Sequence, residues 1–511
     1  MTQGLKISDL DFILSCVQEG FPLWVEGRPP PRLDAPNLPG ATKFPDVVDD
    51  YIAREQQLGR VEGPFDAPPF PDLVVSPIGP VPKAEPGKFR MIHHLSWPED
   101  HTSVNAGICD DMASVQYVRL SDAVRVLEKW GQGTQMAKCD VEEAYRQLPV
   151  RPADYPLLGF RWKEQFYFDK RLPMGCRSSC RTFQMFSDIL ADVTRQIRPT
   201  GTILNLLDDY LFIGRPGTSD AFALQSAFEL ICQTIRLPLK ASKSVKPTSC
   251  LTFLGLELDS DHMQVRLPED KRLKFLEKLR KFRVTTAPAI DEWRSLAGSL
   301  SYAVVAIPTG RAFLRRLFQA FAGQEKHRRF MRMSHHVRQD LDVWETFLVS
   351  FNGKMILGPR TVVTMGADAS GSGFGLVFGS QWTYGFWPQQ CAPWNIAVKE
   401  LYPLFLGLHM WGRECSHSSL QFFSDNRAVV DVLTTLSARD GALSDILRGI
   451  VGLSMRHNIV LHPVHVPGKE NTACDLLSRN QVGQFRQRFR EMAQWPTPLP
   501  WSASPRTFVK R

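Results

Sequence analysis

The stretch Thr202-Ile203-Leu204-Asn205-Leu206-Leu207-Asp208-Asp209-Tyr210-Leu211-Phe212-Ile213-Gly214 carries two adjacent carboxylates inside an otherwise apolar run. Aliphatic and aromatic residues on both sides predict a buried hairpin with Asp208 and Asp209 at its tip. Two carboxylates in such a place repel each other and lose hydration, which a fold tolerates when a cation lies between them. The alternative is a solvated Asp-Asp turn between two ordinary strands.

The composition is that of a folded chain with several domains. Its 511 residues suffice for about three domains, and 43% of them are hydrophobic and 22% charged. We find no apolar run of the roughly 18 residues needed to cross a bilayer and no signal-peptide core, so no membrane partner is expected. The ten cysteines form no Cys-x-x-Cys pair, which argues against a zinc site. We expect a cytoplasmic location, with the nucleus as an alternative.

Positive charge is concentrated in one central block. The net charge is +8, and residues 266–333 contain 16 Lys or Arg against 6 Asp or Glu. A basic block between two acid-bearing regions is typical of a surface that follows a polyanion. The alternative is an ordinary solvated helical surface.

Hydrophobic periodicity gives a coarse map of the elements. Residues 1–70 are rich in proline and are expected to be irregular apart from one helix at 44–58. Residues 481–511 carry six Lys or Arg against Glu491 and are expected to be poorly ordered. Helices are predicted at 122–130, 183–195, 221–235, 268–282, 291–305, 311–321 and 337–351, and strands within 77–107, 135–141, 204–213, 251–258 and 361–387.

A second acidic position ends a predicted strand. Asp140 lies in Met136-Ala137-Lys138-Cys139-Asp140-Val141-Glu142-Glu143-Ala144-Tyr145. Carboxylates from separate strands can bridge two hard cations of the Mg²⁺ type, which is the ligand set that nucleotide addition needs. The alternative is a helix-capping role for Asp140.

These two segments resemble motifs of reverse transcriptases. Asp140-Val141-Glu142-Glu143-Ala144-Tyr145 is similar to their first palm motif, and Leu206-Leu207-Asp208-Asp209 to their Asp-Asp box. The resemblance implies that Asp140, Asp208 and Asp209 hold two Mg²⁺ ions, or Mn²⁺. It also implies that the Tyr145 ring blocks a ribose 2′-hydroxyl, so that dNTPs are preferred; otherwise Tyr145 is a packed core tyrosine.

Further segments match the same family in chain order. Pro82-Lys83-Ala84-Glu85-Pro86-Gly87-Lys88-Phe89-Arg90 resembles the hairpin that grips the triphosphate, which implies that Lys83 and Arg90 bind it. The segment from Leu172 to Gln184 resembles the floor of the nucleotide pocket, where Gly175 lets backbone approach the nucleotide. Retroviral enzymes have Gln where this chain has Met174. Lys243 lies where the family often has a lysine that protonates pyrophosphate.

Four acids in residues 361–480 resemble the Asp-Glu-Asp-Asp set of ribonuclease H, in order and in context. That enzyme cleaves the RNA strand of an RNA-DNA hybrid with two metal ions. A loop histidine, His465, precedes the last acid by ten residues, as it often does in the family, and its alternative is a partly buried structural role. The four acids are Asp368, Glu400, Asp425 and Asp475.

The resemblance implies a multidomain chain of α+β and α/β class, namely a right-hand polymerase followed by a ribonuclease H-like domain. The implied function is RNA-directed DNA synthesis with cleavage of the hybrid, and DNA-templated second-strand synthesis. RNA template, DNA or RNA primer, hybrid and dNTPs are the implied partners, and the oligomeric state stays open. The predicted segments are 1–70 N-terminal extension, 71–260 fingers and palm, 261–352 basic helical thumb, 353–360 linker, 361–480 ribonuclease H and 481–511 basic tail.

The resemblance is most specific in residues 89–98 and 103–108. Phe89-Arg90-Met91-Ile92-His93-His94-Leu95-Ser96-Trp97-Pro98 followed by Ser103-Val104-Asn105-Ala106-Gly107-Ile108 most resembles tyrosine-recombinase retrotransposons of the DIRS order, Ngaro-like, with gypsy-type elements second. Two other interpretations are a non-catalytic nucleic-acid-binding protein descended from such an enzyme, and a DNA-templated polymerase with a proofreading nuclease. The first predicts salt-sensitive binding without turnover.

Overall fold

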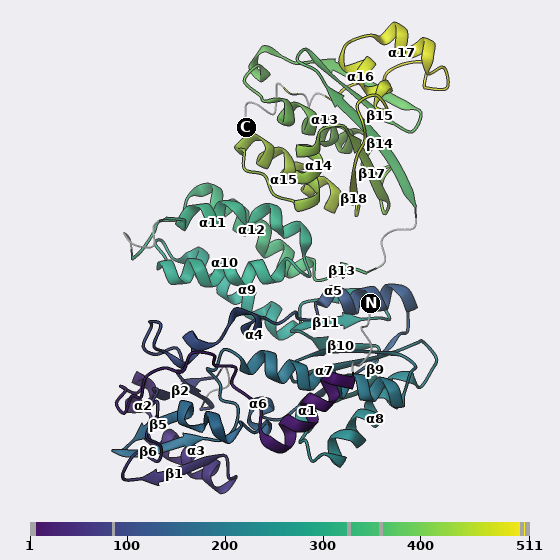
Figure 1. The fold of residues 1–511 in the computed structure, drawn as a ribbon. Helices are drawn as coiled ribbons and strands as arrows, with labels where there is room; N and C mark the ends of the chain where they lie inside the picture. The colour runs from purple at the N-terminus through teal and green to yellow at the C-terminus, as the bar shows by residue number, and fades with distance from the viewer. Residues whose placement is uncertain (1–6, 84–86, 324–328, 357–360, 501–504, 506–511) are drawn as a thin grey trace. The chain divides into compact units, whose positions relative to one another are not determined.

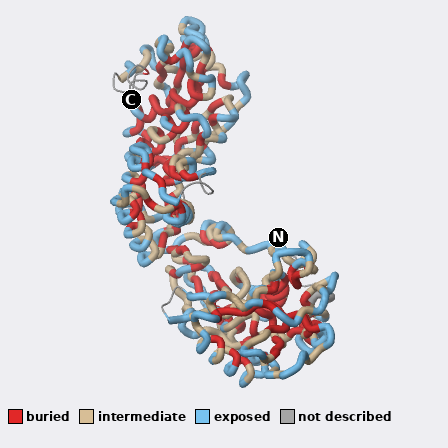
Figure 2. The backbone as a smooth tube through the Cα atoms, turned by 90° about the vertical axis from the view of Figure 1, so that its left-hand side faces the viewer, coloured by how far each residue is buried: buried red, intermediate tan, exposed pale blue. Residues whose placement is uncertain are grey.

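The computed structural model describes residues 7–83, 87–323, 329–356, 361–500 and 505. The chain forms two compact units, and the boundary between them falls within residues 254–263. The first comprises Met1–Leu254 and Asp259–His262, and the second comprises Gly255–Leu258 and Met263–Arg511. In each unit the buried residues run through the interior of its sheets and covering helices (Figure 2). None of the described helices has the length and apolar character required to cross a membrane.

An antiparallel sheet with strand order β7-β8-β4-β9 forms the centre of the first unit (Figure 1). Its strands are β4 (Gln135–Asp140), β7 (Thr202–Leu206), β8 (Asp209–Gly214) and β9 (Val245–Thr248). Helices α7 (Ser179–Ile197) and α8 (Asp220–Thr234) pack on it, and α1 (Ile7–Glu19) packs against α7. Successive side chains of a strand point to opposite faces of the sheet. In β4, Ala137 and Cys139 therefore lie in the core, and Lys138 and Asp140 lie on the other face.

The unit also contains two smaller sheets, and its strand β10 pairs with β11 in a third. The hairpin of β2 (Ile78–Pro82) and β3 (Phe89–His93) confirms the predicted strand pair, and residues 84–86 of its predicted turn lie outside the described residues. The other sheet has the order β1-β6-β5. The remaining elements of the unit are β1 (Val61–Phe65), β5 (Gly159–Trp162), β6 (Gln165–Asp169), β10 (Cys250–Phe253), α2 (Pro39–Lys43), α3 (Pro45–Gln57), α4 (Asp110–Ala113), α5 (Leu120–Trp130), α6 (Ala144–Gln147), η1 (Val104–Gly107), η2 (Pro152–Leu158) and η3 (Ala241–Lys243).

The prediction that residues 1–70 are irregular apart from one helix is wrong. Helix α1 was not predicted, and Phe21 and Leu23 after it are fully buried in the core of the first unit. Pro39 and Pro45 begin α2 and α3, a position where the missing N–H of proline costs nothing. The prolines therefore mark helix starts here, so this segment is an integral part of the first unit.

The first part of the second unit is helical. Its elements are β11 (Leu256–Asp259), β12 (Gln264–Arg266), α9 (Glu269–Val284), α10 (Ile290–Ala303), η4 (Pro308–Phe313), α11 (Arg315–Phe321), α12 (His335–Ser350) and β13 (Lys354–Met355). Trp293 and Trp344 are fully buried among these helices. The predicted linker 353–360 needs correction, because Lys354–Met355 pairs with β12 as a short strand; residues 357–360 lie outside the described residues.

The second part of this unit is a five-stranded sheet with the order β16-β15-β14-β17-β18. Strands β14, β17 and β18 are parallel, whereas β15 and β16 are antiparallel to their neighbours. Helix α13 packs on β14 and β15, and α16 packs on the same two strands. The elements are β14 (Val362–Ala369), β15 (Gly373–Phe378), β16 (Gln381–Phe386), η5 (Gln389–Cys391), α13 (Ile396–Trp411), β17 (Ser419–Ser424), α14 (Arg427–Thr435), α15 (Gly441–Arg456), β18 (Val460–His465), α16 (Thr472–Ser478) and α17 (Val482–Arg488).

The expected disorder of residues 481–511 is wrong for residues 481–500. Phe485 on α17 is fully buried, with its ring centroid 4.9 Å from that of Trp382. The Trp382 Nε1–H donates to the carbonyl of Ala493 at 2.8 Å, and the Thr383 hydroxyl donates to that of Thr497 at 2.9 Å. Aromatic burial outweighs the basic composition that favoured disorder. Residues 501–504 and 506–511 lie outside the described residues.

Candidate active sites

The acid-tipped hairpin is a two-residue turn between β7 and β8. Leu206 pairs with Asp209, so Leu207 and Asp208 form the turn, and Leu207 has φ +52°. A left-handed backbone conformation suits the twist of such a hairpin, but for a leucine it costs conformational free energy of order 1 kcal/mol or more. Two side chains of α7 bind the strained residue. Its N–H donates to Gln184 Oε1 at 2.8 Å, and its carbonyl accepts the Ser187 hydroxyl at 2.7 Å.

Strand pairing brings the three predicted acids of this region together. Asp140, the last residue of β4, lies directly opposite Asp209 in β8. The N–H of Val141 donates to the carbonyl of Asp208 at 2.9 Å. The hairpin tip is therefore fixed against the end of β4, and Asp140, Asp208 and Asp209 share one end of the sheet.

Two lysines neutralise part of this charge. Lys243 Nζ donates to Asp140 Oδ2 at 2.7 Å, and Lys138 Nζ lies 3.0 Å from Asp209 Oδ1. Lys138 is diagonal to Asp209 across the strand pair, where long side chains meet.

The carboxyl pKa values show how crowded the charges are. Burial raises the pKa of Asp140, against the lowering effect of Lys243, and the charge of Asp209 raises it further. The pKa of Asp208 is also raised, by burial and then by the charges of Asp140 and Asp209. Positive charge therefore stabilises such a group of acids, which is the electrostatic property of a cation site.

Tyr145 lies next to this acidic group, on the short helix α6. Its hydroxyl is 3.0 Å from Cys180 Sγ, and its ring packs edge-on against Phe183 at 5.8 Å between centroids. Burial and the contact with Cys180 raise the pKa of the Tyr145 hydroxyl, so it stays neutral. The ring is thus held from the side of α7.

The loop that carries Met174 and Gly175 packs on β3. The carbonyl of Met174 accepts the N–H of His93 at 3.0 Å, and Asn105 Nδ2 donates to the carbonyl of Gly175 at 2.8 Å. Gly175 has φ +126°, and a Cβ there would lie 1.9 Å from the His93 carbonyl oxygen. Close approach of two backbones therefore requires this glycine, a structural reason that the sequence did not reveal.

Substituting Gly175 by Ala is expected to destabilise the first unit by about 3 kcal/mol or more, because both the backbone conformation and the space exclude a methyl group. Gly217→Ala is the matched control, since Gly217 has φ +70° with nothing within 4 Å of its Cβ position. The control is expected to cost about 1 kcal/mol, which is the conformational penalty alone. Urea unfolding of both variants measures the difference. Equal losses would contradict the importance of the His93 contact.

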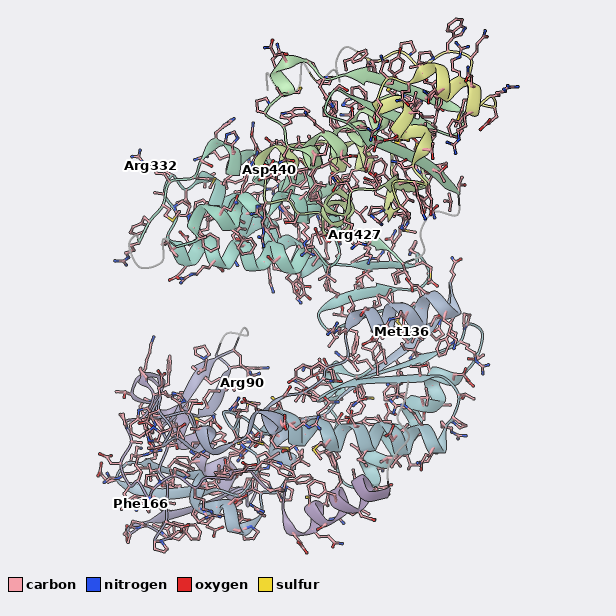
Figure 3. The ribbon with its side chains drawn as sticks, turned by 45° about the horizontal axis from the view of Figure 1, so that its top comes forward. Arg90, Met136, Phe166, Arg332, Arg427 and Asp440 are labelled. Carbon is pink, nitrogen blue, oxygen red and sulfur yellow. The ribbon has the colours of Figure 1, made fainter. Side chains whose placement is uncertain are left out.

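The two predicted triphosphate ligands lie on the β2–β3 hairpin. Arg90 is an exposed residue of β3, opposite Val81, and is labelled in Figure 3. Lys83 is exposed at the end of β2, and its N–H donates to the carbonyl of Lys88 at 2.8 Å. Among the described residues we find no carboxylate paired with either side chain.

A second acidic cluster lies in the C-terminal sheet. Asp368 is near the carboxyl end of β14, Asp425 directly follows the parallel strand β17, and Glu400 comes from α13. One carboxylate oxygen from each of these three residues lies within 4.8 Å of the others, the one such group found among the described residues. Within that part of the chain, Glu400 Oε2 is buried without a hydrogen-bond partner. A carboxylate that has an unpaired buried oxygen and is grouped with two other acids fits a divalent cation.

The pKa of Glu400 reflects this crowding. Burial, and then the charges of Asp368 and Asp425, raise it to about 9. Burial also raises the pKa of Asp368, against the Ser478 hydroxyl that donates to its Oδ2.

Asp475 and His465 lie at the margin of this cluster. Asp475 on α16 forms an ion pair with Arg479 at 2.7 Å, and its charge contributes to the raised pKa of Asp368. His465 ends β18, opposite Ser424 in the register of β17, and is exposed. The fourth acid and the histidine are therefore near the three clustered acids but are not part of the tight group.

Comparison with known proteins identifies the segment that contains the first site. Residues 81–258 match the family model described as reverse transcriptase (RNA-dependent DNA polymerase). Residues 81–258 are a reverse transcriptase domain. The domain includes Asp140, Asp208 and Asp209. Among curated proteins, the Gag-Pro-Pol polyprotein of Human T-cell leukemia virus 2 is 22% identical over 307 residues, which are 58% of this chain and 18% of that polyprotein. The chain thus spans about a fifth of the length of this relative.

Solved structures of reverse transcriptases share the fold. The foamy viral protease-reverse transcriptase dRH in complex with ds DNA superposes with a TM-score of 0.51 at 14% identity, covering 90% of this chain and 80% of that one. The foamy viral protease-reverse transcriptase in complex with RNA/DNA hybrid gives a TM-score of 0.50 at 13% identity, covering 90% and 61%. At such identities the likeness concerns the fold alone, and it confirms the predicted mixture of helical and sheet domains with a polymerase-like fold.

The structure adds residues that the sequence did not single out around the reverse transcriptase motifs. Lys138 binds Asp209, and Gln184 and Ser187 hold the turn. The sequence held one signal that could have identified Gln184 and Ser187. These polar residues are three positions apart, so they share one face of α7, and they are buried among apolar residues. Buried polar side chains need partners, which makes such positions candidates for holding a neighbouring backbone.

Proposed function

We propose that this chain is an RNA-directed DNA polymerase that copies retroelement RNA into DNA and cleaves the RNA strand of the resulting hybrid. The observation that carries the polymerase part is the pairing of Asp140 with Asp209 beside Asp208, within a reverse transcriptase domain. Mg²⁺, or Mn²⁺, held there in a pair would activate the primer 3′-hydroxyl and neutralise the leaving pyrophosphate.

The residues around this site have distinct roles in the proposed reaction. Asp140 and Asp208 supply the cation ligands, and Asp209 is the more loosely engaged acid, since Lys138 holds one of its oxygens. Lys83 and Arg90 bind the triphosphate, and the Tyr145 ring excludes a ribose 2′-hydroxyl. Before a metal ion binds, the Lys243 ammonium group pairs with Asp140. Once a metal ion replaces it there, Lys243 can give a proton to the departing pyrophosphate.

The C-terminal sheet supports the hybrid-cleaving part of the proposal. Asp368 and Asp425, at the carboxyl ends of parallel strands, form an acid group with Glu400 of α13, and Asp475 is the fourth acid beside it. Divalent cations there would make hydroxide from water and stabilise the leaving 3′-oxygen. His465 assists product release. Contacts to 2′-hydroxyls across the minor groove of the hybrid would select the RNA strand.

The order of the two sites favours a retroelement origin. A polymerase followed by a ribonuclease H is the retroelement arrangement, and the segments 89–98 and 103–108 most resemble tyrosine-recombinase retrotransposons of the DIRS order. Gypsy-type elements are the second candidate.

One assay tests both parts of the proposal. The purified chain is given a DNA primer annealed to an RNA template, with dNTPs and Mg²⁺, at two salt concentrations. We expect primer extension and cleavage of the template, both weaker at high salt because duplex binding releases counterions. Salt-sensitive binding without extension would contradict the polymerase and favour a non-catalytic binding protein.

The raised pKa of Glu400 predicts that the stability of the second unit depends on pH. The folded chain keeps a proton on Glu400 up to pH about 9, whereas the unfolded chain releases it near 4.5. Because the folded state binds more protons in this range, stability falls as pH rises from about 5 to 9. We therefore expect the Tm of the second unit without divalent cation to fall between pH 6 and 9, and Mg²⁺ to raise it more at pH 8.5 than at pH 6.

Glu400→Gln is the variant that isolates this effect. It removes the titrating group, so its metal-free Tm is expected to vary less with pH, and Mg²⁺ is expected to raise it less. Differential scanning calorimetry measures both. An unchanged pH slope in Glu400→Gln would contradict the role given to this carboxyl.

A further inference from the structure

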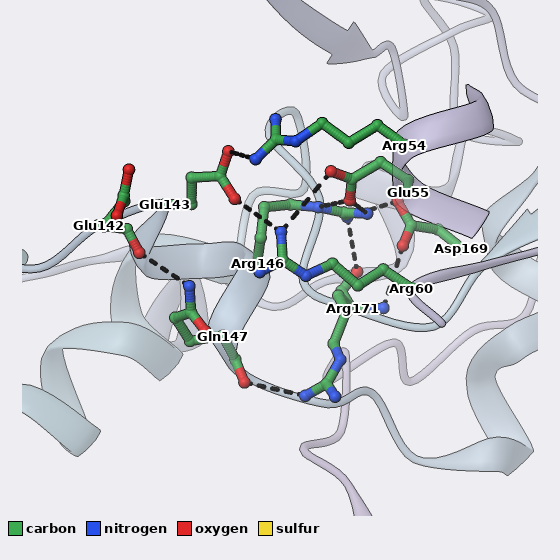
Figure 4. Close-up of polar contacts among 9 residues, drawn as sticks. All are labelled: Arg54, Glu55, Arg60, Glu142, Glu143, Arg146, Gln147, Asp169 and Arg171. Atoms are coloured by element: carbon green, nitrogen blue, oxygen red, sulfur yellow. Dashed lines mark hydrogen bonds and ion pairs between the residues drawn. The ribbon is translucent and has the colours of Figure 1, made fainter. Parts of the chain in front are cut away.

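A network of six charged side chains surrounds the turn between β4 and α6, which carries Tyr145 (Figure 4). Three guanidinium groups and three carboxylates balance in charge. Half of the network comes from α3, which coincides with the helix predicted at 44–58, and from the residue that precedes β1. The six residues, called the turn clamp below, are Arg54, Glu55, Arg60, Glu143, Arg146 and Asp169.

One half of the turn clamp holds Glu143. This residue precedes α6 with φ +50°, a left-handed conformation that costs a glutamate about 1 kcal/mol or more. Its Oε2 accepts from Arg60 Nη1 at 2.7 Å, and its Oε1 accepts from Arg54. The side chain of a strained residue is thus bound on both oxygens by residues from outside the reverse transcriptase match.

The other half holds Arg146. Its guanidinium donates through Nε and Nη2 to Glu55 Oε2 at 3.0 and 2.6 Å, and through Nη1 to Asp169 Oδ2 at 2.6 Å. Arg146, Glu55 and Asp169 are 7%, 1% and 4% exposed. Arg60 Nη1 lies 3.6 Å from Glu55 Oε1 and joins the two halves. Burying such ions is costly, and apolar residues would stabilise a core at least as well. Their fork geometry, by contrast, fixes orientation.

Tyr145 lies between the two held residues of the turn. Glu143 is two positions before it and Arg146 is directly after it, while from α7 Cys180 contacts its hydroxyl and Phe183 packs against its ring. The ring is therefore fixed from one side by α7 and through its own backbone by the turn clamp. A gate that distinguishes two sugars by one hydroxyl group requires such fixing, because small displacements change discrimination strongly.

We propose that the turn clamp positions Tyr145 and so makes residues 54–60, upstream of the reverse transcriptase match, determinants of the sugar specificity of nucleotide addition. The proposal rests on the function proposed above and extends it to a second layer of residues. The clamp residues are positioning residues, since they act through Tyr145.

The test compares kcat/KM for a dNTP and for the matching rNTP on one primed template. Arg60→Met and Glu143→Gln are each expected to lower the preference for dNTP over rNTP by about tenfold. Arg60→Lys, which keeps the positive charge, is expected to lower this preference less than Arg60→Met does. A purely structural defect lowers the active fraction equally for both nucleotides and leaves the ratio unchanged. Lys163→Met is the matched control, because Lys163 forms a 2.6 Å ion pair with Asp49 on the same helix α3.

A Tyr145→Ala background completes the design. If the clamp acts through the ring, the double variant Arg60→Met/Tyr145→Ala has the same ratio of kcat/KM for dNTP and rNTP as Tyr145→Ala alone. Equal changes for dNTP and rNTP in the single variants, or a further change in the Tyr145→Ala background, would overturn the proposal. A wild-type chain that extends no primer would instead contradict the proposed function itself.

Discussion

Asp208→Asn is expected to lower dNTP incorporation by roughly 10³-fold or more, equivalent to about 4 kcal/mol of transition-state stabilisation. Asp208 follows the strained Leu207, which Gln184 and Ser187 hold, so the substituted side chain stays in place. The amide loses the charge and one oxygen that a cation needs. Burial and the nearby acids raise the pKa of Asp208, so the neutral amide is expected to leave the fold as stable or more stable.

Primer extension on an RNA template measures this loss, and cleavage of a preformed hybrid is the internal reference. Cleavage is expected to continue, because the second acid cluster lies on different elements. Asp34→Asn is the control, since the Asp34 side chain is 90% exposed and lies 3.7 Å from Arg161. Normal incorporation by Asp208→Asn would contradict the polymerase site. Loss of cleavage as well would show that the variant is misfolded.

Asp425→Asn is expected to have the reverse effect, lowering hybrid cleavage by roughly 10³-fold while extension persists. Asp425 follows β17 and shares the tight acid group with Asp368 and Glu400. Because it is only partly buried, an amide should be accommodated without unfolding. Removing one acid also relieves the repulsion that raises the pKa of Glu400.

Cleavage of a labelled RNA strand in a hybrid measures this effect. Asp431→Asn is the matched control, because Asp431 is an exposed residue of α14 in the same sheet-and-helix part of the chain. Full cleavage by Asp425→Asn would contradict the proposed nuclease site. The pair Asp208→Asn and Asp425→Asn separates two activities of one chain.

Much of the first site followed from local patterns. An apolar run interrupted by two acids can bury its flanks only as a hairpin, and a strand ending in Asp140 was visible from alternation. The predictions of irregular structure in the proline-rich start and of poor order in the basic end were wrong for the same reason. Composition counts residues, whereas order depends on whether a few of them are buried, such as Phe21 and Phe485, which are fully buried.

The sequence by itself determined which acids are candidates for the two sites and in what order, because the chain neighbours of acids such as Asp140 and Asp208 mark them as strand-end or hairpin-tip residues. The tertiary structure alone decided what surrounds them. Lys243 meets Asp140 across 103 positions and Arg146 meets Glu55 across 91, and no local period encodes such pairs. Their free energy depends on burial and on partners from distant segments, so it exists only once the chain has folded.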